Sequence, residues 1–314
     1  VLPTVIFFSS IMSVLYHIGF MQKIIKYISK LMQKTMGTSG AETTSISANI
    51  FVGQTEAPLV IKPFISKMTN SELMAIMTGG FATVAGGVMA AYVLMLSKTI
   101  PGIAGHLMAA SIMSAPAALV IAKIIYPETD SPETAKGDIE LSKVSDDGNF
   151  LESIGNGATE GMKLALNIAA MLIAFISIIA LLNWALGLIS FGSTILSIEL
   201  ILGYLFMPLA FLMGAPWSEA HILGSLMGQK LVLTEFIAYG NLASLGDSVS
   251  TKTATIAAYA LCGFANFASI GIQLGGIGSI APERKKDLAK LVMKAMIGGA
   301  LASWLTATIA GILL

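Results

Sequence analysis

The feature that most constrains this chain is a polar break inside an apolar segment, and it occurs twice. In the first copy, Thr55 and Glu56 interrupt residues 47–64, which are otherwise apolar enough for lipid. In the second copy, Thr234 and Glu235 interrupt the segment QKLVLTEFIAYG. A carboxylate at bilayer depth costs at least ~3 kcal/mol, so such groups normally face a cavity and have a function. Each break therefore predicts part of a binding site.

The two breaks belong to an internal repeat. Each Thr-Glu pair is followed by a glycine-interrupted apolar segment, and the matching cores are GFAT at residues 80–83 and GFAN at residues 263–266. Repeats with paired, interrupted hydrophobic segments are the best indication from sequence of a secondary transporter's substrate site. We therefore predict two copies of one unit, in which a re-entrant hairpin with a polar tip precedes a broken helix.

The composition is that of a membrane protein. Of 314 residues, 55% are hydrophobic and 11% are charged, with a mean hydropathy of +0.81. A soluble domain normally carries about twice that share of charge. Lys plus Arg equals Asp plus Glu, at 18 each, so no net field suggests a nucleic-acid partner. The single cysteine, Cys262, excludes an internal disulfide and is expected to be a small buried thiol.

Six segments are long and apolar enough for a ~30 Å hydrocarbon core. They are residues 1–20, 73–96, 103–122, 161–184, 254–281 and 295–314. Four lysines at helical spacing, Lys23, Lys26, Lys30 and Lys34, predict a cytoplasmic interfacial helix after the first span. Residues 185–215 are expected to contain a second interfacial helix that leads into the second hairpin.

With this count, the basic segment PERKK at residues 282–286 is cytoplasmic, as the positive-inside rule requires. The two hairpins then enter the membrane from opposite faces, which is the geometry of an inverted repeat. The expected fold is therefore an all-α polytopic membrane protein. It would have six spans and two re-entrant helical hairpins in an inverted repeat, with interfacial helices.

These elements divide the chain into five expected parts. The central loop is expected to be polar and solvated because residues 127–152 hold eight of the 18 acidic residues. The parts are a scaffold span and interfacial helix at 1–36, the first hairpin and broken helix of a transport domain at 37–126, a polar cytoplasmic loop at 127–158, a scaffold span and interfacial segment at 159–200, and the second hairpin, broken helix and last span at 201–314.

Two other classes of protein are alternatives. The string GTSG at residues 37–40 resembles the nucleophile signature of rhomboid-like intramembrane serine proteases. In such an enzyme Ser39 would need a histidine base within hydrogen-bond reach, and His106 and His221 lie near the ends of expected segments. Otherwise Ser39 is a helix cap beside a small-residue hinge. A channel built on the same fold would also keep the polar tips.

The chain resembles the concentrative nucleoside transporter family over essentially its whole length. The resemblance is carried by GQTEAPL at residues 53–59, TEFIAY at 234–239, YALCGFANFASIGIQLGG at 259–276 and APERKK at 281–286. It implies a symporter in the plasma (inner) membrane that imports nucleosides on a cation gradient. It also implies a homotrimer and an elevator-like movement of a hairpin-bearing domain. Members carry further N-terminal helices, which we expect this chain, beginning at Val1, to lack.

The resemblance also implies the substrate-binding residues. Four match the family's nucleobase contacts, three match its ribose contacts, and one is its aromatic neighbour of the substrate. They are, in that order, Gln54, Thr55, Glu56 and Val88; Glu235, Asn266 and Ser269; and Phe264. A carboxylate can accept paired, charge-assisted bonds from the vicinal hydroxyls of a ribose. An amide and a hydroxyl suit a base edge that mixes donors and acceptors.

The same resemblance implies a sodium site between the first hairpin and the first broken helix. Its residues are Asn49, the backbone of Val52, Thr83 and the backbone of Val84. The family pattern has Ser where Thr83 stands, a change that keeps the hydroxyl. Oxygen-only ligation suits a hard cation. We therefore expect sodium as the coupling ion, with no other cofactor, and coupling to protons through Glu56 or Glu235 as the alternative.

Overall fold

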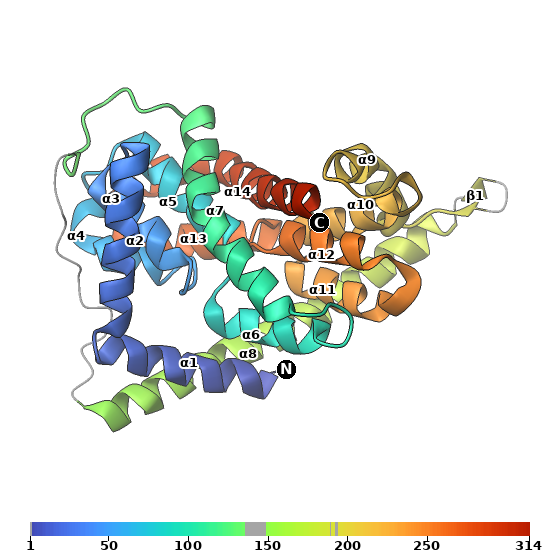
Figure 1. The fold of residues 1–314 in the computed structure, drawn as a ribbon, viewed down its shortest axis with the longest axis horizontal. Coiled ribbons are helices and arrows are strands. Elements are labelled where there is room, and N and C mark those ends of the chain that lie inside the picture. The colour runs from blue at the N-terminus through green and yellow to red at the C-terminus, as the bar shows by residue number, and fades with distance from the viewer. Residues whose placement is uncertain (1, 136–148, 189, 192–193) are drawn as a thin grey trace.

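A computed structural model describes the chain except for residues 1, 136–148, 189 and 192–193 (Figure 1). In the described first half, all regular secondary structure is helical. Its elements are α1 (Leu2–His17), α2 (Phe20–Met36), α3 (Gly40–Asn49), the 3-10 helix η1 (Ala57–Ile61), α4 (Lys62–Ile65), α5 (Asn70–Ala82), α6 (Gly86–Leu96) and α7 (Ile103–Ile125). The order is the predicted one, in which a first span and a basic helix precede a hairpin and a broken helix.

The second half repeats this order of helices. Its elements are α8 (Phe150–Leu186), a hairpin of β1 (Ser190–Phe191) with β2 (Thr194–Ile195), α9 (Ile198–Leu212), α10 (Trp217–Val232), α11 (Glu235–Leu245), η2 (Gly246–Ser248), α12 (Thr251–Leu261), α13 (Phe267–Ile280), η3 (Pro282–Arg284) and α14 (Lys285–Leu313). The two strands are antiparallel, and Ser190 pairs with Ile195. Apart from this pair, all regular secondary structure in the described chain is helical.

Four helical segments in the described part of the chain are long and apolar enough to cross a membrane. They are Asn70–Leu96, Ile103–Ile125, Phe150–Leu186 and Pro282–Leu313. The number rises to six if the bent pairs α1–α2 and α9–α10 each count as one span. The predicted broken span at 254–281 consists of two shorter helices, α12 and α13. The all-helical membrane fold is confirmed, and the exact number of spans stays a prediction.

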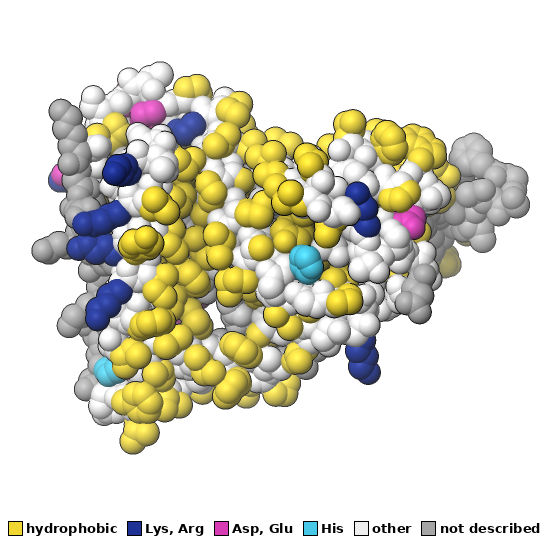
Figure 2. All heavy atoms as spheres, in the orientation of Figure 1, with side chains coloured by type: hydrophobic (Ala, Val, Ile, Leu, Met, Phe, Trp, Pro, Cys, Tyr) yellow, Lys and Arg dark blue, Asp and Glu magenta, His cyan; other side chains and the backbone are white. Residues whose placement is uncertain are grey.

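The basic helix α2 has the amphipathic form that the sequence predicts. It is bent by 78° from α1 and buries Met21, Ile25, Ser29 and Met32 along one side. Its lysines are on the exposed side, and Figure 2 shows Lys and Arg gathered over this edge while hydrophobic side chains cover the middle of the same face. A helix of this form suits a membrane interface.

The first hairpin has unequal arms. Its first arm, α3, is buried along its whole length. The return arm is a 3-10 turn followed by the four-residue helix α4, and each begins with a proline at one of its first two positions, Pro58 and Pro63. Proline removes an N–H donor, fits the first turn of a helix and costs about 3 kcal/mol in a helix interior. Two prolines five residues apart therefore disfavour a single regular return helix.

Both predicted helix breaks are present, and they touch each other. The first lies between α5 and α6 at residues 83–85, and the second lies between α12 and α13 at residues 262–266. The backbone N–H of Phe264 donates to the carbonyl of Thr83 at 3.2 Å. Gly263 has φ +154, and a Cβ there would lie 2.8 Å from the Phe81 carbonyl oxygen. Glycine at this position therefore allows the two breaks to meet.

The helix α8 begins before the predicted span and runs through residues that we assigned to the polar loop. Asn149 caps it by accepting from the N–H of Glu152. Its first turns pack closely on α1 through glycines, and a Cβ on Gly157 would lie 2.8 Å from the Ser10 Cα. Figure 1 shows α1 and α8 side by side. This packing explains why polar sequence at 150–160 is helical.

The C-terminal helix α14 holds the core together because it packs against α5, α7 and α12. A Cβ on Gly299 would lie 2.3 Å from the Phe81 Cβ and 2.9 Å from its carbonyl carbon, so the backbone itself would have to shift.

We expect Gly299→Ala to destabilise the protein by about 1–3 kcal/mol, measured as a lower Tm in detergent. Gly105→Ala in α7, where nothing lies within 4 Å, is the control and should not lower the Tm.

Candidate functional site

A cavity of about 270 Å³ lies where the two hairpin tips meet the two helix breaks. The first hairpin, α6, α8, the start of α11 and the α12–α13 break all contribute to its wall. All eight predicted substrate-binding residues line it, namely Gln54, Thr55, Glu56, Val88, Glu235, Phe264, Asn266 and Ser269. The structure therefore brings together in one cavity residues from both repeats.

The second hairpin presents a buried carboxylate to this cavity. Thr234 caps α11, so Glu235 is the first residue of that helix and is only 5% exposed. Tyr92 of α6 donates its hydroxyl to Glu235 Oε1 at 2.8 Å, and Asn266 donates its amide to Oε2 at 2.9 Å. Each carboxylate oxygen keeps capacity for a further donor. The group is thus held in place by two neutral donors and can still accept from a ligand.

Asn266 has a fixed orientation. Its Oδ1 caps α13 by accepting from the backbone N–H of Ser269 at 2.8 Å, so its Nδ2 must point to Glu235. Both Asn266 and Ser269 are buried. The α12–α13 break and the first turn of α13 therefore supply two polar groups to one side of the cavity, the Asn266 amide that holds Glu235 and the Ser269 hydroxyl.

The tip of the first hairpin forms the opposite side. The Glu56 carboxylate accepts a hydrogen bond from the backbone N–H of Gly53, which closes the turn. Gln54 is buried, and its Oε1 accepts from Nε2 of Gln273 on α13 at 3.1 Å. Thr55 contacts α13 as well, because a Cβ on Gly276 would lie 2.6 Å from its Cγ2. The tip is therefore packed against a helix of the other repeat.

The predicted sodium ligands lie where the first hairpin turn meets the first break. Asn49, the last residue of α3, is fully buried, and neither of its side-chain polar atoms has a hydrogen-bond partner among the described residues. The turn and the break are joined by a bond from the Gly86 N–H to the Phe51 carbonyl at 3.0 Å. Thr83 donates its hydroxyl proton to the Gly79 carbonyl at 3.0 Å, which leaves its oxygen free to accept.

An orphaned buried amide calls for an explanation such as a bound ion or water. Val84, in the break, is fully buried, and Val52, in the turn, is half-buried. The set offers neutral oxygens, which suit a monovalent cation better than an anion. The residues present at this point therefore fit sodium.

A second cavity of about 400 Å³ continues from the first. The two share Gly53, Glu56, Ala85 and Leu164 in their walls. The second one extends along α1 and the first turns of α8, where the charged residues Glu160 and Lys163 are part of its wall. The first cavity thus has a continuation with charged residues in its wall, beside α1 and the start of α8.

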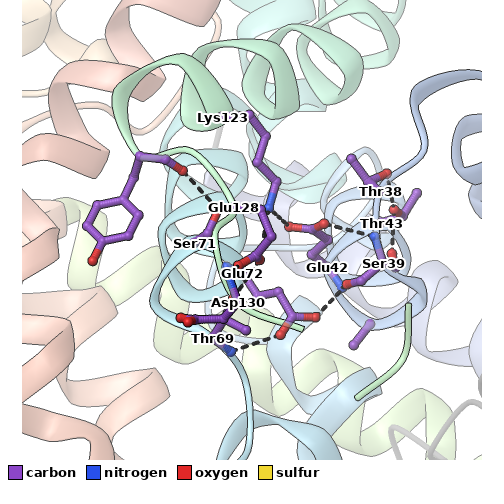
Figure 3. Close-up of polar contacts among 12 residues, drawn as sticks. Thr38, Ser39, Glu42, Thr43, Thr69, Ser71, Glu72, Lys123, Glu128 and Asp130 are labelled. Carbon is purple, nitrogen blue, oxygen red and sulfur yellow. Dashed lines mark hydrogen bonds and ion pairs between the residues drawn. The ribbon is translucent and has the colours of Figure 1, made fainter. Parts of the chain in front are cut away.

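Ser39 has a structural role. Its hydroxyl accepts from the N–H of Glu42 in a capping box and donates to Glu72 Oε1 at 2.5 Å, as Figure 3 shows. Lys123 of α7 pairs with Glu42 at 2.7 Å, so this cluster ties α3 to α5 and α7. The helix-cap interpretation is confirmed. Among the described residues, Ser39 has no histidine partner that could act as the base of a serine nucleophile.

Three polar residues at the cavity, Tyr92, Asn167 and Gln273, stand out among those that the prediction did not include. Tyr92 and Asn167 line the cavity, and Gln273 supports Gln54 from behind. Asn167 and Gln273 each stand alone as polar groups in apolar stretches, which is a signal of function in a membrane segment. Tyr92 carries no such signal because a tyrosine is common in apolar helices.

Comparison with known proteins gives consistent results. The family model described as "Na+ dependent nucleoside transporter C-terminus" matches residues 106–311, and one described as "Nucleoside recognition" matches residues 1–99. The chain is 48% identical over 313 residues to the uncharacterized transporter YutK of Bacillus subtilis, covering 99% of this chain and 76% of that protein. It is 45% identical over 332 residues to sodium/nucleoside cotransporter 1 of Rattus norvegicus, covering 100% and 50%.

The fold matches solved structures over the same extent. A structure of CNTnw in an inward-facing substrate-bound state matches with a TM-score of 0.91 and 45% identity, covering 99% of this chain and 74% of that one. The chain thus spans about three quarters of the bacterial relative and about half of the mammalian one.

Proposed function

The chain belongs to the Na+-dependent nucleoside transporter family, and on this premise we propose that it imports nucleosides by symport with sodium. It is an integral membrane protein of a transporter family, not an enzyme. The observation that carries the proposal is the convergence of both hairpin tips and both helix breaks on one cavity, with the Glu235 carboxylate held in its wall. A site made by two repeats in this way is typical of alternating-access transporters.

We assign the ribose to the Glu235 side of the cavity and the base to the first hairpin. Glu235 would accept from two ribose hydroxyls while Tyr92 and Asn266 hold it, and Ser269 would add a further polar contact. Gln54, Thr55, Glu56 and Val88 would contact the nucleobase, with Phe264 beside it. A cavity of about 270 Å³ is close to the range of small-molecule sites.

Sodium is the proposed coupling ion, held by Asn49, the Val52 carbonyl, Thr83 and the Val84 carbonyl. The support is the orphaned buried amide of Asn49 and the names of relatives such as the rat sodium/nucleoside cotransporter. Proton coupling through the cavity carboxylates is the second candidate for the driving ion.

The order of elements supports an inverted repeat with six spans. The interfacial helix, hairpin, broken helix and closing helix are α2, α3–α4, α5–α6 and α7 in the first half and α9, α10–α11, α12–α13 and α14 in the second. We propose that the hairpins and broken helices, at 37–126 and 201–314, move as one body along a scaffold containing α1 and α8. Such a scaffold would form a homotrimer in the plasma membrane, with the loop at 127–158 in the cytoplasm.

Counterflow in proteoliposomes tests the proposal. Vesicles loaded with unlabelled uridine should accumulate labelled uridine from outside, and external sodium should increase the rate. Ser39→Ala is a matched control, because a lost helix cap costs about 0.5–2 kcal/mol of stability and should leave exchange intact. A channel would show no such accumulation, and a protease would lose its activity with Ser39. The proposal would be overturned if none of the nucleosides tested showed counterflow.

A further inference from the structure

Gln273 is a buried amide next to the cavity whose role is not explained by substrate contact. It lies in the middle of α13, is fully buried and does not line the cavity. Its Nε2 donates both to the backbone carbonyl of Met77 in α5, at 3.0 Å, and to Oε1 of Gln54, at 3.1 Å. It therefore joins α5, α13 and the first hairpin tip at one point.

The Met77 carbonyl determines the orientation of both amides. A carbonyl oxygen only accepts, so the atom of Gln273 that faces it must be the nitrogen. That nitrogen has two hydrogens, and the second can meet Gln54 only if the oxygen of Gln54 faces it. The Nε2 of Gln54 is then the polar atom left for the cavity that Gln54 lines.

The backbone is shaped to keep this contact. A Cβ on Gly80 of α5 would lie 2.6 Å from Gln273 Nε2 and 3.0 Å from Gln54 Cβ, so only glycine leaves room for the two amides. Oε1 of Gln273 has no partner among the described residues, although it is buried. A buried acceptor without a partner costs stability. Nε2 alone therefore makes the hydrogen bonds of this amide, and both of them orient neighbouring groups, the Met77 carbonyl and the Gln54 side chain.

We infer that Gln273 is a positioning residue that fixes Gln54 as a hydrogen-bond donor towards the nucleobase. This inference rests on the proposed function. The base must then offer an acceptor to Gln54, so the site favours nucleosides whose base edge bears a carbonyl over those with an exocyclic amine at the same point. Uridine and cytidine differ in this way at the 4-position, where one has an oxygen and the other an amino group.

The experiment compares uridine and cytidine dissociation constants in wild type, in two variants of Gln273 and in the reference variant Gln54→Ala. Wild type is expected to bind uridine about tenfold more tightly than cytidine, since two facing donors cannot form a bond. Gln273→Leu should bring the ratio towards one, because Gln54 is then free to turn. Gln273→Glu should reverse it. A neutral carboxyl can donate to Met77 and accept from Gln54 Nε2, which turns the Gln54 oxygen towards the base.

Several outcomes decide the matter. If the Gln273 variants bound both nucleosides more weakly but kept the wild-type ratio of the two dissociation constants, Gln273 would only support the fold, and the inference would be overturned. A wild type that does not prefer uridine to cytidine would overturn it as well. Gln54→Ala is the reference for complete loss of the contact. If Gln273→Leu does not fold, the nearly isosteric Gln273→Glu carries the test. Failure of wild-type counterflow would instead reject the proposed function, so the two failures are distinguishable.

Discussion

Glu235→Gln is expected to weaken ribonucleoside binding by about 100-fold, because each hydrogen bond to a charged group contributes about 1.5–3 kcal/mol and a neutral one about half of that. The geometry around the carboxylate increases the loss. Asn266 cannot turn, since its Oδ1 caps α13, so it must donate to whatever stands at position 235. The oxygen of a glutamine would therefore face Asn266, and its NH2 group would face Tyr92 and the ribose.

Equilibrium binding of labelled uridine to the purified protein measures this effect. Nucleosides lacking the 2′- or 3′-hydroxyl should lose less affinity in the variant than uridine does, because they make fewer bonds to the carboxylate. Tyr92→Phe is the matched control: it removes one donor that holds Glu235 but leaves the charge, so a smaller loss is expected. An unchanged uridine Kd in Glu235→Gln would refute the ribose assignment.

The parts of the site that could be predicted are those with a local signal. Glycines and polar residues inside apolar runs mark the hairpin tips and the helix breaks, and each of these elements lies where the sequence places it. The residues that the prediction missed act across the repeats. Tyr92 and Glu235 are 143 positions apart, and Gln54 and Gln273 are 219 apart, so no local pattern joins them.

The shape of the helices was also harder to predict than their existence. The paired prolines Pro58 and Pro63 break the return arm of the first hairpin into short pieces. The polar start of α8 is helical because its glycines pack on α1, a contact that composition cannot indicate. The proline rings determine the conformation of the return arm, and packing on α1 determines that of the start of α8. The length of the apolar segment determines neither.

The contacts across the repeats suggest how the ion and the nucleoside affect each other. Gln273 of α13 holds the first hairpin tip by its hydrogen bond to Gln54. Tyr92 of α6 holds the second hairpin tip by its hydrogen bond to Glu235. The two breaks are joined directly by the bond from the Phe264 N–H to the Thr83 carbonyl. An ion that orders residues 83–84 would therefore also order the backbone beside the nucleoside. This contact would be a direct physical route for coupling between the proposed ion site and the proposed nucleoside site.

Asn49→Ala is accordingly expected to abolish the sodium dependence of nucleoside binding. In wild type, sodium should raise nucleoside affinity by about 5–150-fold, the usual range for coupling between sites, and by linkage the nucleoside must raise sodium affinity equally. Removing the amide oxygen should leave nucleoside affinity near the sodium-free value at every sodium concentration. Thr83→Ala should act in the same direction, while Thr83→Ser keeps the hydroxyl and should retain the response.

The measurement is uridine Kd against sodium concentration at fixed pH. Ser45→Ala is the matched control, because Ser45 lies one turn before Asn49 on α3, is equally buried and also has a hydroxyl without a partner among the described residues. If a general loss of polarity in α3 were the cause, both Asn49→Ala and Ser45→Ala would lose the sodium dependence of the uridine Kd. The sodium assignment would be refuted if the wild-type uridine Kd did not change with sodium concentration and uptake depended on a pH gradient alone. The coupling role would then pass to Glu56 or Glu235, the carboxylates that line the cavity.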